Sequence, residues 1–188
     1  MRANLFLIEK TMQTVQLLDK KFALSISEET ILEKISLVAD KINTDLADKN
    51  PLFVAILNGS FMFAADLMKK INFPCQISFI KLASYHGTTS TNNVLELVGL
   101  NENLAGKTVV IVEDIVDSGL TISKIIELLK SRGAEKILIA TLLFKPDALK
   151  HDLTLDYVAM EIPNDFIVGY GLDYDGYGRN LKDIYTVV

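Results

Sequence analysis

Two apolar runs, at 108–112 and 137–144, constrain the fold of this chain more than any other feature. Neither run alternates polar with apolar residues, which is typical of strands that are covered on both faces. The stretch between them, 121–132, has the spacing of a helix and is followed by Gly133, a residue suited to a helix C-terminus. The order strand, helix, strand predicts a mostly parallel sheet flanked by helices, an α/β fold.

The same pattern extends to both sides of this unit. A long amphipathic helix is expected from about 27 to 48, because Ser25 and Glu28 have capping-box spacing and Asn50-Pro51 would stop a helix. Further elements are expected as strands at 52–57, 75–82 and 94–100, a helix at 61–71, and short strands near 155–160, 166–168 and 184–188. We therefore expect one domain over 1–188. Its core would span about 27–150, and a small hood lobe would form from the N-terminal segment and about 151–188.

Composition excludes several classes of function. The chain has 19 basic and 24 acidic side chains, and its net charge of −5 disfavours binding to nucleic acid or to an anionic membrane surface. The apolar stretch 51–68 is interrupted by polar residues at 58–60 and by Asp66, so no membrane span is expected. Cys75 is the single cysteine, which rules out an intrachain disulfide and favours a cytoplasmic location.

The residues after the run at 108–112 favour a functional site. Glu113 and Asp114 come first, Asp117 follows, and a Ser-Gly turn then leads into the helix that opens at Thr121. A helix N-terminus offers free N–H groups and positive potential to an anion, while the acids can handle hydroxyls, protons or a metal. An ordinary helix cap would explain one of these residues and leave the acid pair without a role. The segment therefore predicts a site for a sugar that carries a phosphate.

This segment, EDIVDSGLT at 113–121, resembles the phosphoribosyl-diphosphate (PRPP) binding motif of type I phosphoribosyltransferases. Three further segments narrow the resemblance to the hypoxanthine–guanine members of that family: LNGSFMFAADL at 57–67, LLFKP at 142–146 and EIPNDFIVGYGLDY at 161–174. The resemblance implies the type I fold with its hood. It also implies Mg²⁺-dependent transfer of 5-phosphoribosyl from PRPP to hypoxanthine, and to guanine as well, with release of pyrophosphate. Kinship further implies a homodimer or homotetramer.

The resemblance also assigns roles to residues of this chain. It makes Asp117 the general base at purine N7. It places at PRPP and its phosphates Leu57, Asn58, Gly59, Glu113, Asp114, Asp117, Ser118, Gly119, Leu120, Thr121 and Arg179. It places at the purine Lys145, Phe166, Ile167 and Asp173, and at the metal Glu113, Asp114 and Asp173. Ser84 and Tyr85 match the start of a flexible loop that closes over the reacting centre.

One position departs from the family pattern. Members of the family often carry a basic residue where this chain has Asn58, so pyrophosphate would be held there by the backbone, with a cis Leu57–Asn58 bond as one way to build the turn. Two other functions compete with the main one. A PRPP-sensing binding protein would keep the fold without catalysis, and a sister enzyme would act on adenine or a pyrimidine.

Overall fold

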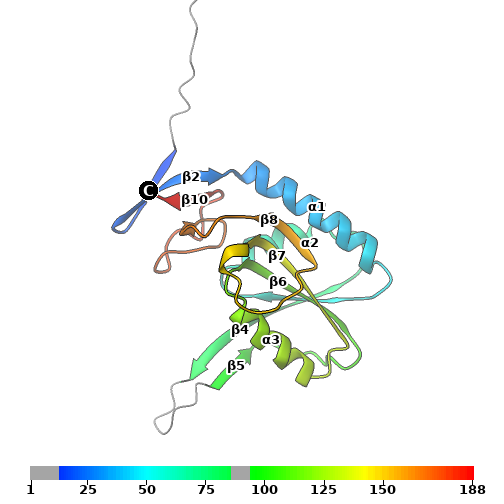
Figure 1. Ribbon diagram of the computed structural model, residues 1–188. Helices are drawn as coiled ribbons and strands as arrows, with labels where there is room; N and C mark the ends of the chain where they lie inside the picture. The colour runs from blue at the N-terminus through cyan, green and yellow to red at the C-terminus, as the bar shows by residue number, and fades with distance from the viewer. Residues whose placement is uncertain (1–12, 86–93) are drawn as a thin grey trace, which may run out of the picture.

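A computed structural model describes residues 13–85 and 94–188 of the chain (Figure 1). A six-stranded sheet forms its centre, in the order β5-β4-β3-β6-β7-β8. These strands are β3 (Leu52–Ile56), β4 (Gln76–Tyr85), β5 (Val94–Val98), β6 (Thr108–Val116), β7 (Lys136–Phe144) and β8 (Tyr157–Glu161). Neighbours are parallel except β4 and β5, which pair antiparallel. The predicted α/β fold is confirmed.

Helices cover both faces of this sheet, as Figure 1 shows. Helices α1 (Glu28–Leu46) and α2 (Phe61–Met68) lie on one face, and α3 (Leu120–Ser131) lies on the other. Strand residues alternate between the two layers: Phe53 packs with α1 and α2, whereas Val54 packs with α3, and all the residues of β3 are buried. The absence of polar alternation in the apolar runs follows from this two-sided cover.

A second, smaller sheet forms the hood. It joins the two ends of the chain in the order β1-β2-β10-β9, with every pair antiparallel. Its strands are β1 (Thr14–Leu17), β2 (Lys20–Ile26), β9 (Ile167–Val168) and β10 (Ile184–Val187). The small lobe predicted from the terminal segments is thus present. Strand β8 belongs to the larger sheet, so the C-terminal contribution to the hood sheet begins at β9.

Two local expectations were wrong in detail. Ser25 does not cap α1, because it lies in β2 and its hydroxyl donates to the Ile184 carbonyl; the N-cap is Ser27, whose Oγ accepts from Thr30 N–H at 3.4 Å. Strand β6 does not stop at residue 112 but continues to Val116, so the acid pair lies inside the sheet. Within residues 13–85 and 94–188, no helix is both long and apolar enough to cross a membrane.

Candidate active site

The turn between β6 and α3 lines a cavity of about 320 Å³ at the carboxyl end of the parallel strands. Gly119 is the N-cap of α3 and has a φ of 81°, a left-handed conformation that a side chain would disfavour. The lining residues are Glu113, Ile115, Asp117, Ser118, Gly119, Thr121 and Ile122. The cavity therefore places acid groups beside the N-terminus of a 12-residue helix.

Glu113 is the most unusual group of this cavity. Its side chain is buried in β6, and its Oε2 atom has no hydrogen-bond partner within the described residues. Burial raises the pKa of the Glu113 carboxyl well above its ordinary value, and the neighbouring Asp114 charge raises it further. An unpartnered buried carboxyl costs stability, so its presence at the cavity favours a role in binding.

Asp114 supports the turn that follows β3. A methyl group added at Gly59 would overlap the Asp114 carboxylate, so this close approach requires glycine. The peptide bond between Leu57 and Asn58 is cis, as the resemblance allowed. Burial raises the pKa of Asp114, while backbone hydrogen bonds and the Arg179 charge oppose this rise. The acid pair thus joins the cavity at α3 to the turn at 57–59.

Lys145 reaches the same edge of the sheet from the next strand. Val116 of β6 pairs with Phe144 of β7, and Lys145 N–H donates to the Val116 carbonyl at 2.9 Å. Asp117 and Lys145 therefore leave their strands side by side. The Lys145 side chain is 8% exposed, and its Nζ donates to the Asp165 carbonyl at 2.7 Å.

The loop after β9 brings two more of the predicted residues together. Arg179 Nη2 lies 2.5 Å from Asp173 Oδ1, and Arg179 Nη1 donates to the Gly171 carbonyl at 2.7 Å. Asp173 Oδ2 also accepts from Gly176 N–H at 2.7 Å. These contacts use two of the five N–H donors of the guanidinium and fix its plane.

The remaining predicted residues lie in the hood and on β4. Phe166 is 44% exposed, whereas Ile167 is 9% exposed and pairs with Thr186 of β10. Ser84 and Tyr85 are the last residues of β4, where their backbones pair with β5. Residues 86–93, which continue the flexible loop that the resemblance implies, lie outside the described residues.

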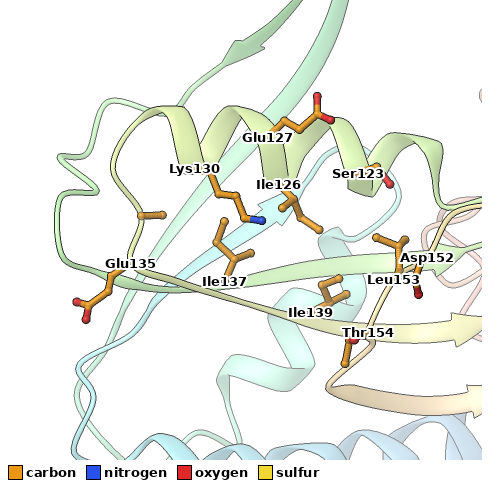
Figure 2. Close-up of a pocket in the computed structure, with 11 residues that line it drawn as sticks. Ser123, Ile126, Glu127, Lys130, Glu135, Ile137, Ile139, Asp152, Leu153 and Thr154 are labelled. Atoms are coloured by element: carbon orange, nitrogen blue, oxygen red, sulfur yellow. The ribbon is translucent and has the colours of Figure 1, made fainter.

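Another cavity, of about 390 Å³, lies between α3 and β7 (Figure 2). Ile126 and Lys130 reach from the helix toward Ile137 on the strand, and Asp152 and Thr154 close the far side. It contains none of the predicted site residues, and its β7 residues, Ile137 and Ile139, lie in the first half of that strand. Ligands of open parallel sheets bind outside the carboxyl ends of the strands, so we assign the active site to the β6–α3 cavity instead.

Comparison with known proteins decides the family. Residues 26–175 match the model of the phosphoribosyl transferase domain family. The chain belongs to this family. A hypoxanthine-guanine phosphoribosyltransferase of Streptococcus agalactiae serotype V is 43% identical over 156 residues, which cover 82% of this chain and 87% of the relative. One from Streptococcus mutans serotype c is 42% identical over 168 residues, covering 85% and 93%.

Solved structures agree with this phosphoribosyltransferase assignment. A hypoxanthine-guanine phosphoribosyltransferase from Bacillus anthracis, with a HEPES molecule in its active site, is 40% identical and has a TM-score of 0.80. The match covers 88% of this chain and 98% of that one. A hypoxanthine phosphoribosyltransferase from Staphylococcus aureus is 38% identical with a TM-score of 0.80, over 88% and 90% of the two chains. The resemblance found in the sequence and the fold it implies are confirmed.

Sequence reasoning missed two participants of this phosphoribosyltransferase site. The Asp165 carbonyl holds the Lys145 ammonium, and the Gly171 carbonyl holds Arg179. Both act through backbone atoms, which every residue type carries, so no residue pattern could have indicated them. Within the described part of the chain, no group of three or more histidine, cysteine or acidic side chains is placed to hold a metal. A bound cation would need ligands from water or substrate as well.

Proposed function

We propose that this phosphoribosyltransferase transfers the 5-phosphoribosyl group of PRPP to a 6-oxopurine, hypoxanthine and also guanine, in purine salvage. The observation that carries the proposal is that Asp117 and Lys145 follow neighbouring strands at the same edge of the sheet. Their strand ends are joined by the Lys145 N–H to Val116 carbonyl bond, and Asp117 lines the cavity at the start of α3. One edge of the sheet would therefore offer the Asp117 carboxyl and the Lys145 ammonium to a purine, next to a helix N-terminus that suits a sugar phosphate.

The phosphate end of PRPP would bind at the β6–α3 turn. The backbone and hydroxyls from Ser118 to Thr121, Leu120 included, surround the N-terminus of α3, where N–H groups and the helix dipole favour an anion. Gly119 allows this turn because its φ of 81° disfavours a side chain, and Leu149, His151 and Leu153 fill the space where a side chain would lie. Glu113 and Asp114 would accept hydrogen bonds from the ribose hydroxyls, which would give Glu113 Oε2 the partner that it lacks.

The pyrophosphate end would lie between the turn at Leu57–Gly59 and Arg179. The close approach of the Asp114 carboxylate to Gly59 holds this turn. The Arg179 guanidinium is near enough for its charge to lower the pKa of Asp114. Because Asn58 is neutral, backbone groups rather than a lysine would meet the leaving group at the turn. Arg179 would supply the positive charge that stabilises the pyrophosphate as it departs.

Mg²⁺ suits the oxygen donors of this site. Glu113, Asp114 and Asp173 supply carboxylates, and Mg²⁺ usually takes one or two of these together with waters and substrate phosphates. When bound, the ion would neutralise charge on the pyrophosphate. The residues of the chain would orient both substrates, which brings the purine nitrogen in line with the sugar carbon.

Lys145, Phe166 and Ile167 would define the purine site. The Lys145 ammonium keeps two donors after its bond to the Asp165 carbonyl, and a donor prefers the 6-oxo group to a 6-amino group. The exposed ring of Phe166 would stack on the base, and the Ile167 backbone together with Asp173 would read its edge. This arrangement favours hypoxanthine and guanine over adenine.

Asp117 would take the purine N7 proton as the new bond to N9 forms. The sugar carbon becomes cationic while pyrophosphate leaves, as in glycoside chemistry. Removing the N7 proton makes the purine N9 a stronger nucleophile toward this carbon. Replacing Asp117 with asparagine keeps the shape but removes the base. We expect turnover to fall about 10²- to 10⁴-fold while PRPP affinity stays near wild type. Turnover like that of the wild type would contradict the role.

Pyrophosphate release and PRPP binding together separate the proposal from the sister enzyme and the PRPP-sensing protein. The wild-type protein is mixed with PRPP, Mg²⁺ and one of hypoxanthine, guanine, xanthine, adenine or a pyrimidine base, and pyrophosphate release is measured. Release with hypoxanthine supports the proposal, and release with guanine extends it. Release with adenine or a pyrimidine alone would identify the sister enzyme. PRPP binding by calorimetry without release on any base would identify the PRPP-sensing protein.

We also propose a homodimer or homotetramer in the cytoplasm. The outer side of β4 leaves Ile77 36% and Phe79 43% exposed, and Phe61 at the start of α2 is 41% exposed. Apolar side chains of this size are typical of surfaces that pair with another copy of the chain. Light scattering coupled to gel filtration measures the number of subunits directly.

A further inference from the structure

Three aromatic rings, one from the N-terminal hairpin and two from the C-terminal segment, meet where Phe166 would stack on the purine. Phe22 comes from β2, Phe166 precedes β9, and Tyr174 lies in the loop after β9. The ring centroids of Phe166 and Tyr174 are 5.6 Å apart, and their planes meet at 87°, an edge-to-face contact. Phe22 lies 5.9 Å from Phe166 and 6.2 Å from Tyr174. All three separations fall in the attractive range for aromatic pairs.

Tyr174 is itself held by the tip of the N-terminal hairpin. Its hydroxyl donates to Asp19 Oδ1 at 2.6 Å, across 155 positions of sequence. Asp19 lies in the turn between β1 and β2, next to Leu18, whose φ is 51°. Lys20, the first residue of β2, has its Nζ 5.6 Å from the centroid of the Tyr174 ring. The hairpin tip therefore contacts the tyrosine by a hydrogen bond and by a cation–π contact.

This chain of contacts ends on the ring that meets the base. Phe166 is 44% exposed, and Phe22 beneath it is fully buried. A ring so exposed could turn about its side-chain bonds unless a neighbour fixed its plane. The Tyr174 ring meets it at nearly a right angle and leaves the rest of the Phe166 ring open to a ligand.

We propose that Tyr174 is a positioning residue for the purine, which fixes the plane of Phe166, and that Asp19 holds Tyr174 in place from the hairpin tip. The inference rests on the proposed function, because it needs Phe166 to stack on the base. It also predicts which of the two substrates is affected. Purine binding depends on the hairpin tip, and PRPP binding does not.

The test compares Michaelis constants for the two substrates. Tyr174→Leu removes the ring, and we expect the KM for hypoxanthine to rise about fivefold to tenfold while the KM for PRPP stays within about twofold. Tyr174→Phe keeps the ring and should restore most of the purine affinity. Tyr177→Leu is the matched control, because the Tyr177 side chain is 59% exposed in the same loop and forms no aromatic pair within the described residues.

A double-mutant cycle tests the link to the hairpin. Tyr174→Phe and Asp19→Ala each remove the same hydrogen bond, so each should raise the KM for hypoxanthine about twofold to threefold, and the double variant should resemble either single one. If Tyr174→Leu does not fold, this cycle still tests whether Tyr174 and Asp19 support purine binding.

Several results would overturn the inference. These are a wild-type KM for hypoxanthine in Tyr174→Leu, an equal rise in both Michaelis constants, or the same effect in Tyr177→Leu. Additive effects of Tyr174→Phe and Asp19→Ala would overturn the part that concerns the hairpin. A wild-type protein inactive on every base would instead reject the proposed function, so the two failures are distinguishable.

Discussion

Replacing Glu113 with glutamine is expected to make the protein more stable at neutral pH and less active. Burial holds the pKa of Glu113 well above its ordinary value of 4.5, and Oε2 has no partner within the described residues. Between pH 4.5 and the raised value, the folded chain keeps a proton that the unfolded chain has lost. The free energy of unfolding therefore falls as the pH rises through this window, and the contribution of this group is fully present only below it.

The size of the effect follows from proton linkage. One extra proton in the folded state changes the free energy of unfolding by up to about 1.4 kcal/mol for each pH unit. In a chain of this length, 1 kcal/mol shifts Tm by roughly 2–4 °C, so Glu113 should cost about 3–5 °C per pH unit. Glutamine is neutral throughout and escapes this cost. The Tm of Glu113→Gln minus that of the wild type should grow as the pH rises above the ordinary value of 4.5.

The assay is thermal unfolding of both proteins across this pH range, together with turnover. Glu127→Gln serves as the control, since Glu127 is an exposed glutamate of α3, and the Tm of this variant should follow that of the wild type at every pH. A Tm difference between Glu113→Gln and the wild type that stays constant with pH would refute the reasoning. Loss of turnover together with a gain in stability would show that the carboxyl is kept for function at a cost to the fold.

Two further variants test the site. Lys145→Ala should raise the KM for hypoxanthine about 10- to 100-fold, as expected for a lost charged hydrogen bond. The control is Lys150→Ala, which changes an exposed lysine and should leave this KM unchanged. Equal effects of the two variants would contradict the recognition role of Lys145. Gly59→Ala should lower kcat/KM about 10- to 100-fold, because the new methyl group displaces the Asp114 carboxylate. Full activity in Gly59→Ala would show that Asp114 tolerates the shift.

The parallel sheet was predictable from the chain alone, because each of its central strands is apolar on both faces. The runs at 108–112 and 137–144 became β6 and β7, and the pattern at 121–132 became α3. What the pattern could not show was the extension of β6 through Glu113 and Asp114. Charged residues usually end a buried strand, and only the packing of the 57–59 turn and α3 against this strand permits two buried acids there.

The cap of α1 shows the same limit on a smaller scale. Ser25 and Ser27 both lie near the start of the helix, and Ser25 has the better spacing to Glu28. The structure gives Ser27 the cap because Ser25 is taken up by β2 and bonds to β10. The pairing of β2 with β10, from the far end of the chain, therefore determined which serine caps α1.

By itself, the sequence determined the fold class, the turn before α3 and the acids beside that turn, since each depends on neighbours within about ten residues. Only the tertiary structure decided which groups meet across long separations. Lys145 comes to Asp117 through strand pairing, Asp114 comes to Gly59 through sheet order, and the Tyr174 hydroxyl comes to Asp19 through the hood. These contacts depend on where whole elements pack, and no local pattern of side chains encodes that position.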